Sequence, residues 1–381
     1  MQHSSAGLIT LFPYRFDVTA EELYRDILLV YSQADTLAED EFKEAVERDL
    51  DENLTPDEIM VVVRQPAFEC TVSAFQNSAV LATIKKRVNS AIIVAAFGSD
   101  GRETYRQVVH GATKFEPLRL ERLVRRTITH ILTRHDGYEE AHGNYHFQIP
   151  SGRHTERFIR YASVLVDAAE LSFVALGALP LISEHINLAY VDTSGLFEFV
   201  AAISDHLRAF VQTRPSITVK NFQSYDGYKE CRFRVAPTTF VFISASGSGT
   251  LSREILKQAR LSPQQIIHLL YFGRSEESFT TICNLSRHPE LNPEGLDESK
   301  LPQDYRAIDC ELCKKGSTFV PLRGDHFELP GPQPMPIEIT IQDAPRSLGP
   351  LFARLGAQKV FHVGFGKTRD RTDPSTVPHR P

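Results

Sequence analysis

The sequence predicts an α/β protein in which a mostly parallel sheet is flanked by helices. Apolar strand candidates alternate with amphipathic helix candidates over residues 139–275, which is the order expected of a parallel sheet covered on both faces. The clearest unit is the buried apolar run 240–243, followed by a bend of serines and glycines and then by apolar residues at helical spacing. We expect this domain to lie between an N-terminal mixed α/β domain and a C-terminal extension.

Residues 1–138 are predicted to form the N-terminal mixed helical domain. Strand-like apolar runs occur at residues 8–11, 59–63 and 92–96. Apolar residues at helical spacing predict helices over residues 21–31 and 118–135, and the acidic residues of 39–52 predict a helix with a solvated face. In the first of these helices the apolar stripe consists of Leu23, Ile27, Leu28 and Tyr31.

Residues 139–275 are predicted to form the central domain. Strands are expected at residues 172–176, 186–191, 217–219, 240–243 and 266–272. Helices are expected at residues 158–171, 195–210 and 251–256. In a parallel sheet, ligands bind at the carboxyl ends of the strands. The loops 192–195 and 244–250 both follow strands, so we expect both at that edge.

The last part of the chain is predicted to be an extension and a tail. Residues 276–365, the C-terminal extension, are rich in proline and glycine. Residues 366–381 are polar, charged and proline-containing, with Val377 as their one apolar side chain. Such a composition cannot bury a core, so we expect a disordered tail.

Composition and charge exclude several classes of protein. The chain has 48 acidic and 42 basic residues, and its net charge of −6 gives no general attraction to nucleic acid. No apolar run approaches the roughly 18 residues that cross a bilayer, and the N-terminus lacks a signal-peptide pattern. Five widely spaced cysteines fit a reducing compartment better than a disulfide framework. We therefore expect a cytoplasmic protein with no membrane segment, and we find no strong signal for a nucleic-acid partner. Both a homodimer and a protein partner stay open.

The bend after the run 240–243 has the composition of an anion site. Glycines let the backbone approach a ligand, successive amides point inward, and the following helix N-terminus carries partial positive charge. We predict that a phosphate is held here by Ser246, Gly247, Ser248, Gly249 and Thr250. The alternative is a plain turn in which Thr250 is the helix N-cap.

Three segments of the central domain carry motifs that occur together in one enzyme family. They are Phe-Gln-Ile-Pro-Ser-Gly-Arg-His-Thr-Glu-Arg-Phe-Ile at 147–159, Ala-Tyr-Val-Asp-Thr-Ser-Gly-Leu at 189–196, and the strand and bend at 241–250. Their order and spacing resemble the type I phosphoribosyltransferases, most closely the orotate-type branch. In that family the first segment is an extended run that meets Ser-Gly-Lys/Arg before a helix. The second carries the pyrophosphate loop, and the third binds the 5′-phosphate of phosphoribosyl pyrophosphate.

The resemblance implies a phosphoribosyltransferase-like fold and a phosphorylated ribose ligand, either phosphoribosyl pyrophosphate or a nucleotide. The phosphate would be bound by the bend 246–250. The residues that would contact the rest of the ligand are Ser244, Asp192, Thr193, Ser194, Arg153 and Lys220. An active member of the family would also use Mg²⁺.

The phosphate motif departs from the family at two positions that matter for catalysis. Active members carry two adjacent acids there, which bind the ribose hydroxyls and stabilise the cationic transition state. In this chain the positions fall on Ile243 and Ser244, or on Ser244 and Ala245. A serine cannot offset developing positive charge, and that electrostatic term is often the largest in catalysis. Asp192 and Glu254 are the candidate substitutes for the missing carboxylate.

Three functions therefore follow from the resemblance. The first is a degenerate phosphoribosyltransferase that binds its ligand and acts as a nucleotide sensor or regulator, as in the prokaryotic defence systems where divergent relatives occur. The second is an active transferase that moves ribose 5-phosphate to a base with Mg²⁺ and a non-standard carboxylate. The third is an interaction scaffold whose phosphate site is vestigial.

The loop 220–230 lies just before the phosphate strand. In the family this interval holds a mobile catalytic loop, and Lys220 or Lys229 would reach a pyrophosphate from it. The Asp226-Gly227 pair favours a surface β-hairpin instead. A hairpin can also serve as a lid, so the two interpretations do not exclude each other.

Cysteines and histidines give two candidate metal patterns. Cys310 and Cys313 form a C-x-x-C pair, and Cys283 and His288 are the predicted additional ligands of a structural Zn²⁺. Their irregular spacing also fits partly buried free thiols. His142, His146 and His154 match no standard ligand spacing, so we expect no metal site at these histidines.

Overall fold

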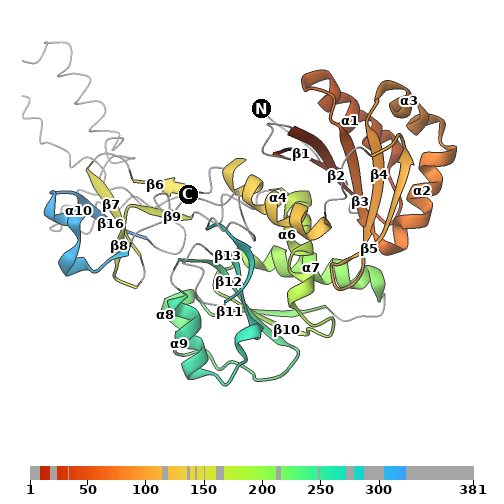
Figure 1. Ribbon diagram of the computed structural model, residues 1–381. Helices are drawn as coiled ribbons and strands as arrows, with labels where there is room; N and C mark the ends of the chain where they lie inside the picture. Colours follow the sequence, from red (N-terminus) through yellow and green to blue (C-terminus); the bar gives the residue numbers. More distant parts are fainter. Residues whose placement is uncertain are drawn as a thin grey trace, which may run out of the picture. The chain divides into compact units, whose positions relative to one another are not determined.

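The computed structural model describes residues 9–17, 24–32, 34–113, 119–134, 138–141, 144–149, 151–159, 167–211, 216–247, 249–271, 279–286 and 304–322. These residues form two five-stranded sheets, one four-stranded sheet and one two-stranded sheet (Figure 1). All of them belong to the larger of two units, residues 1–326. Parallel strands flanked by helices confirm the predicted α/β class. The predicted tail 366–381 lies outside the described residues.

The N-terminal sheet has the strand order β1-β2-β3-β4-β5. Its strands are β1 (Ile9–Asp17), β2 (Tyr24–Ser32), β3 (Glu58–Arg64), β4 (Ala91–Phe97) and β5 (Glu103–His110). Strands β2, β3 and β4 are parallel, and β1 and β5 pair with them in the antiparallel sense. One face packs against the helices α1 (Glu39–Glu52), α2 (Phe68–Asn77) and α3 (Ala79–Arg87). The short 3₁₀ helix η1 (Gln65–Ala67) joins β3 to α2.

The helix predicted over residues 21–31 is wrong, because residues 24–32 form strand β2. Ile27 and Tyr31 face one hydrophobic cluster, whereas Leu28 and Val30 face the other. A strand that is buried on both faces is a continuous apolar run, and such a run also satisfies helical spacing over a short window.

The second five-stranded sheet is the predicted parallel sheet. Its strands are β10 (Leu188–Val191), β11 (Thr218–Asn221), β12 (Thr239–Ser246), β13 (Ile266–Tyr271) and β14 (Thr280–Asn284). All of its strand pairs are parallel, in the order β11-β10-β12-β13-β14. The chain moves one way from β10 to β11 and the other way from β12 to β14. The strand order therefore reverses between β10 and β12.

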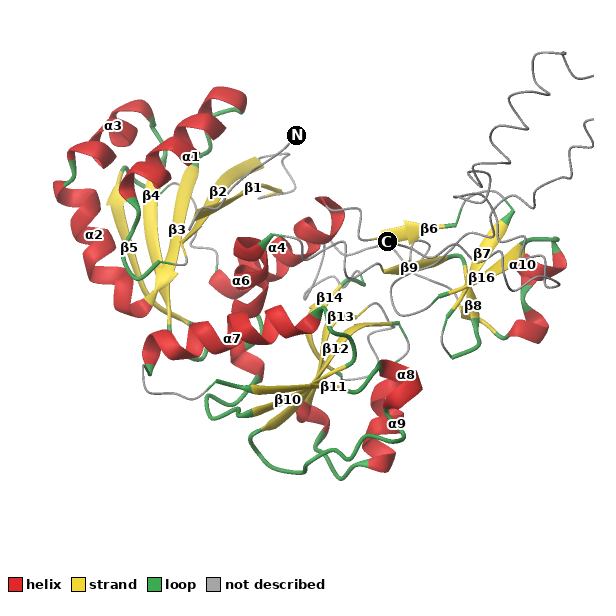
Figure 2. Cartoon of the chain, turned by 180° about the vertical axis from the view of Figure 1, so that it is seen from behind, coloured by secondary structure: helices red, strands yellow, loops and turns green. Residues whose placement is uncertain are grey.

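Helices cover both faces of this sheet. Helix α7 (Leu196–Phe210) packs on one face, and helix α9 (Thr250–Gln258) packs on the other, next to the short helix α8 (Ser224–Gly227). Figure 2 shows α7 and the pair of α8 and α9 on opposite sides of the strands. The 3₁₀ helix η3 (Pro263–Gln265) leads into β13.

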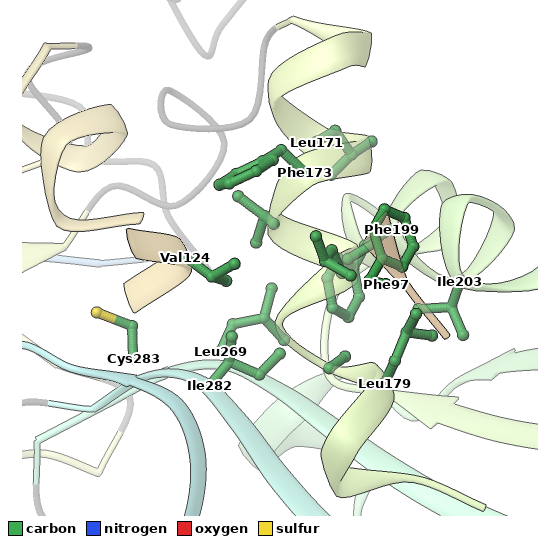
Figure 3. Packing of buried hydrophobic residues seen from close by; sticks show 14 of the residues in the cluster. Phe97, Val124, Leu171, Phe173, Leu179, Phe199, Ile203, Leu269, Ile282 and Cys283 are labelled. Carbon is green, nitrogen blue, oxygen red and sulfur yellow. The ribbon is translucent and has the colours of Figure 1, made fainter. Parts of the chain in front are cut away.

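One hydrophobic cluster connects the two five-stranded sheets through α7 and the helices α4 (Leu120–Arg134) and α6 (Ala168–Leu176). Figure 3 shows Phe97 of β4, Val124 of α4, Phe173 of α6 and Leu269 of β13 in this cluster. The strand predicted at 172–176 is wrong, because these residues belong to α6. Every described residue of α6 after Ala168 is buried, so the helix has no polar face that would reveal its period. The 3₁₀ helix η2 (Leu179–Leu181) follows it.

The remaining strands form two small sheets. Strands β6 (Tyr138–Glu140) and β9 (Arg157–Ile159) pair with each other. The four-stranded sheet has the order β15-β8-β7-β16, from β7 (Tyr145–Gln148), β8 (His154–Thr155), β15 (Asp304–Tyr305) and β16 (Thr318–Pro321). Between β15 and β16 lie the 3₁₀ helix η5 (Ala307–Asp309) and the helix α10 (Glu311–Lys314).

These sheets correct two expectations. The helix predicted at 158–171 is wrong at its start, because residues 157–159 form β9, and it is right at its end, where α6 begins. The boundary placed at residue 275 passes through two sheets. Strand β14 completes the parallel sheet from beyond it, and β15 and β16 pair with β8 and β7 from before it. Among the described helices, none has the length and apolar character needed to cross a bilayer.

Candidate metal centre

Two histidines and two cysteines meet at one point of the four-stranded sheet. The ligand atoms of His146, His154, Cys310 and Cys313 all lie within 4.8 Å of one another. His146 Nε2 lies 3.0 Å from His154 Nδ1, and Cys313 Sγ lies 3.4 and 3.3 Å from these two nitrogens. Cys310 Sγ lies 3.7 Å from His146 Nε2. The first three residues are buried and Cys313 is half-buried.

A β-hairpin brings the two histidines together. Strands β7 and β8 are antiparallel, and Gln148 pairs with His154. Side chains two residues apart on a strand share a face, so His146 is the diagonal neighbour of His154 on the same face. The connecting turn is closed by a hydrogen bond from Ile149 N–H to Arg153 O (2.9 Å).

The C-x-x-C segment forms a tight turn that directs both sulfurs to the same point. Cys310 is the N-cap of α10, and its sulfur accepts a hydrogen bond from the amide of Cys313 (3.5 Å). Gly316 follows with φ +85°, a left-handed conformation that glycine adopts without strain. An amide that donates to a sulfur stabilises the thiolate, which is the form that binds metals.

The dimensions of the cluster fit a tetrahedral zinc site. Zn–N bonds of about 2.0–2.1 Å and Zn–S bonds of about 2.3 Å, at tetrahedral angles, separate ligands by roughly 3.3 Å (N···N) to 3.8 Å (S···S). The N···N distance of 3.0 Å and three N···S distances of 3.3–3.7 Å agree to within a few tenths of an ångström, and the two remaining pairs, both of Cys310 Sγ, lie within 4.8 Å. Two imidazoles and two thiolates are a donor set that zinc prefers.

The surroundings prepare both imidazoles for a metal. Burial lowers the pKa of His146 and of His154, and the neighbouring ring lowers that of His146 further, so the neutral form that ligates is favoured. Ser317 Oγ lies 2.9 Å from His146 Nδ1 and so orients that ring from outside the cluster. Burial raises the pKa of the Cys313 thiol, and the charge of a bound dication opposes this effect.

The cluster contains two of the four predicted zinc ligands together with two histidines. Cys310 and Cys313 are in it, whereas Cys283 of β14 lies in the hydrophobic cluster beside Ile282 (Figure 3). His288 lies outside the described residues. The sequence predicted no metal site at the histidines, whereas His146 and His154 lie in this cluster, whose geometry could hold a metal. His142 also lies outside the described residues. The missed signal was the Ser151-Gly152 turn, which places histidines eight residues apart on one face of a hairpin.

The predicted ligand edge of the parallel sheet is built around a buried acid. Asp192 follows β10, and its carboxylate accepts hydrogen bonds from Ser244 N–H (3.1 Å) and from Ser244 Oγ (2.9 Å). Burial raises the pKa of Asp192 from 3.8 to about 7, although the hydrogen bonds from Ser244 oppose this shift. The pair joins the carboxyl ends of β10 and β12, where the strand order reverses. Thr193 and Ser194 continue from Asp192 toward the start of α7.

The predicted phosphate bend follows β12 directly. Gly249 has φ +64°, and its amide donates to Ser246 Oγ (3.0 Å). The ring of Phe279 lies where a Cβ on Gly249 would project. Ser246, Gly247 and Thr250 are half-buried, and Ser248 lies outside the described residues. The Gly249 amide is therefore already engaged in a hydrogen bond within the bend. That the bend binds a phosphate stays a prediction.

Two further predicted ligand contacts have other surroundings. Arg153 donates to the backbone oxygen of Asp304 (2.7 Å) and lies 3.8 Å from its carboxylate, so it joins two strands of the four-stranded sheet. Lys220 lies in β11, which is the edge strand next to β10. The hairpin predicted over residues 220–230 is wrong, because residues 224–227 form helix α8. Phe222 and Tyr228, on either side of α8, are buried in the cluster that holds α9.

Buried serine–histidine contacts occur at two other places. His206 Nε2 lies 2.8 Å from the carbonyl oxygen of Ser172, and His268 Nε2 lies 2.7 Å from Ser252 Oγ. Burial lowers the pKa of both histidines to about 4. Both pairs are buried, so they stabilise packing between elements and have no access to a substrate.

No protein-family model matches this sequence, and no curated protein is similar to it. The chain can therefore be classified by its architecture alone. It is an α/β protein with a doubly wound parallel sheet and a Cys₂His₂ cluster.

Proposed function

We propose that the protein binds one zinc ion through His146, His154, Cys310 and Cys313. The observation that carries this proposal is the convergence of four ligand atoms within 4.8 Å from two segments 159 residues apart. Four protein ligands complete a tetrahedral shell, and such closed sites serve structure rather than catalysis. The zinc therefore supports the four-stranded sheet.

Metal analysis of the purified full-length protein tests this proposal. We expect about one zinc per chain, in keeping with a single four-ligand site. The double variant Cys310→Ser/Cys313→Ser should lose it. Cys231→Ser is the matched control, because Cys231 is a free, half-buried cysteine outside the cluster and its replacement should leave the zinc content unchanged. Less than about half a zinc per wild-type chain would contradict the proposal.

As a second function we propose that the carboxyl edge of the parallel sheet binds a phosphorylated ribose ligand. The reversal of strand order between β10 and β12 supports this, because open parallel sheets bind ligands at such points. The buried Asp192 also supports it, since acids with strongly raised pKa values gather at functional sites. A bound phosphate would accept the hydrogen bond that the Gly249 amide now donates to Ser246 Oγ.

Binding without transfer is the form of this function that we propose. Transfer would need an ionised acid near the ribose, together with Mg²⁺. The carboxyl of Asp192 is bonded to Ser244, and burial holds part of its population protonated near neutral pH. A ligand sensor or regulator therefore fits these residues better than a transferase.

Calorimetric titration with phosphoribosyl pyrophosphate and with nucleoside monophosphates tests the second function. Thr250→Glu places an acid in the first turn of α9, where it favours the helix but repels a phosphate. We expect this variant to fold and to bind at least tenfold more weakly. Gln264→Glu adds the same charge at an exposed position and should bind normally. No heat with any of these compounds would favour a scaffold whose phosphate site is vestigial.

A further inference from the structure

We propose that the zinc fastens residues 304–322 to the β7–β8 hairpin, and that removing the metal releases this segment while the parallel sheet stays folded. The proposal rests on the proposed zinc site and assigns it a role. The metal would control whether one part of the chain is attached to the rest.

Among the described residues, the segment's other contacts with the hairpin are short strand pairings and a few side-chain contacts, such as the hydrogen bond from Arg153 to Asp304. Strand β15 pairs with β8 over two residues, and β16 pairs with β7 over four. Cys310, Val320 and Leu322 are its buried apolar residues among those described. Ile308 is 85% exposed and Phe319 is 46% exposed. Segments of this size rarely bury enough apolar surface to fold on their own, and a structural metal commonly compensates.

The core of the molecule does not depend on the segment. The three hydrophobic clusters that hold the two five-stranded sheets and their helices contain no residue from 304–322. The described residues of the β7–β8 hairpin are also absent from them. The described residues of the four-stranded sheet thus contribute no side chain to these clusters, and we expect its loss to leave them intact.

The proposed metal joins two parts of the chain that are far apart in sequence. The entire parallel sheet lies between His154 and Cys310, so the segment must return to the hairpin after a long excursion. Because the sheet stays folded when the metal is removed, the conformational entropy that the metal opposes is that of the released segment and of residues 287–303, which connect it to β14. Among the contacts described between the segment and the hairpin, the four-ligand cluster is the one that would cross-link them through metal bonds.

A single tryptophan gives a direct reporter of this attachment. The chain has no tryptophan, so Phe319→Trp introduces the only one. Phe319 lies in β16, with its ring centroid 5.0 Å from that of His154, and it is exposed enough to accept a larger ring. We expect its emission to shift to the red when a chelator removes zinc from the full-length protein. Re-addition of zinc should reverse the shift, and Mg²⁺ should not.

Hydrogen exchange on the unmodified full-length protein, with and without chelator, is the decisive measurement. We expect residues 304–322 and β7 to lose protection when zinc is removed, while β10 and β12 keep theirs. Trypsin should then cut more than tenfold faster after Arg306, Lys314 and Lys315, which are exposed in the segment.

Two outcomes would overturn the proposal and leave the zinc site standing. One is unchanged protection of residues 304–322 after stoichiometric loss of zinc. The other is loss of protection in β10 and β12 together with the segment, which would make zinc a requirement of the whole fold. A wild-type protein that contains no zinc would instead overturn the proposed function, and this inference with it.

Discussion

Asp192 makes stability depend on pH through one buried carboxyl group. Its pKa is raised by burial from 3.8 to about 7, so the folded protein holds this proton more tightly than the unfolded chain does. Between these two values the native state binds more protons, and stability falls as pH rises. The effect ends above about pH 7, where both states are ionised.

We predict that Asp192→Asn removes the fall in stability that Asp192 causes as the pH rises. Relative to the wild type, the variant should gain up to a few kcal/mol in the free energy of unfolding between about pH 4.5 and 7.5, because each pKa unit corresponds to about 1.4 kcal/mol. Urea unfolding at several pH values measures it. Ser244→Ala should extend the wild-type loss to higher pH, since it removes a hydrogen bond to the ionised form and so raises the folded-state pKa further. Parallel curves for the wild type and Asp192→Asn would refute the assignment.

Ser317 contacts one of the proposed metal ligands from outside the cluster. Its hydroxyl lies 2.9 Å from His146 Nδ1, on the side of the ring that faces away from the cluster. We predict that Ser317→Ala weakens zinc binding by about tenfold, as the loss of such outer partners commonly does. Competition with a coloured chelator measures the affinity. Thr318→Ala, one residue further on and exposed, should bind zinc as the wild type does, and equal affinities for both variants would contradict the role of Ser317.

At the scale of elements, the turn between β12 and α9 depends on the absence of a side chain at Gly249. Its φ of +64° disfavours other residues, and Phe279 fills the space that a Cβ would need. We predict that Gly249→Ala lowers the free energy of unfolding by about 2–4 kcal/mol, from backbone strain and overpacking together.

Gly152→Ala separates these two causes. Gly152 has φ +77°, and a Cβ added to it would meet no atom within 4 Å, so only the backbone cost of about 1 kcal/mol applies. Thermal or urea unfolding compares the variants. If both substitutions cost the same, Phe279 does not fill the space beside Gly249. A partial recovery in Gly249→Ala/Phe279→Leu would support the packing.

The local sequence pattern was enough to predict amphipathic elements, but it did not predict the type of elements that are buried on every side. Helices α1, α4, α7 and α9 each have one apolar stripe, and the sequence predicted all four within two residues at each end. Strand β2 and helix α6 are surrounded by other elements, so burial erased the alternation that tells a strand from a helix. Turn chemistry misled at Asp226-Gly227, where the burial of Phe222 and Tyr228 outweighed a local hairpin signal.

At the scale of the whole molecule, the candidate metal centre could be only half predicted. The C-x-x-C pair is a local pattern, and the sequence identified both of its cysteines. The histidines are brought to it by parallel pairing of β16 with β7 across more than 160 residues, which no spacing rule contains. Cys283 was also predicted as a ligand, whereas the structure places it in the hydrophobic core.

The most direct test of the central claim is the absorption spectrum of the full-length protein with Co²⁺ in place of zinc. We expect one cobalt per chain with the intense visible bands of a tetrahedral site and a thiolate-to-metal charge-transfer band, both lost in Cys310→Ser/Cys313→Ser and kept in Cys231→Ser. Weak octahedral bands, or the same spectrum in the double variant, would show that these four residues do not form the metal site.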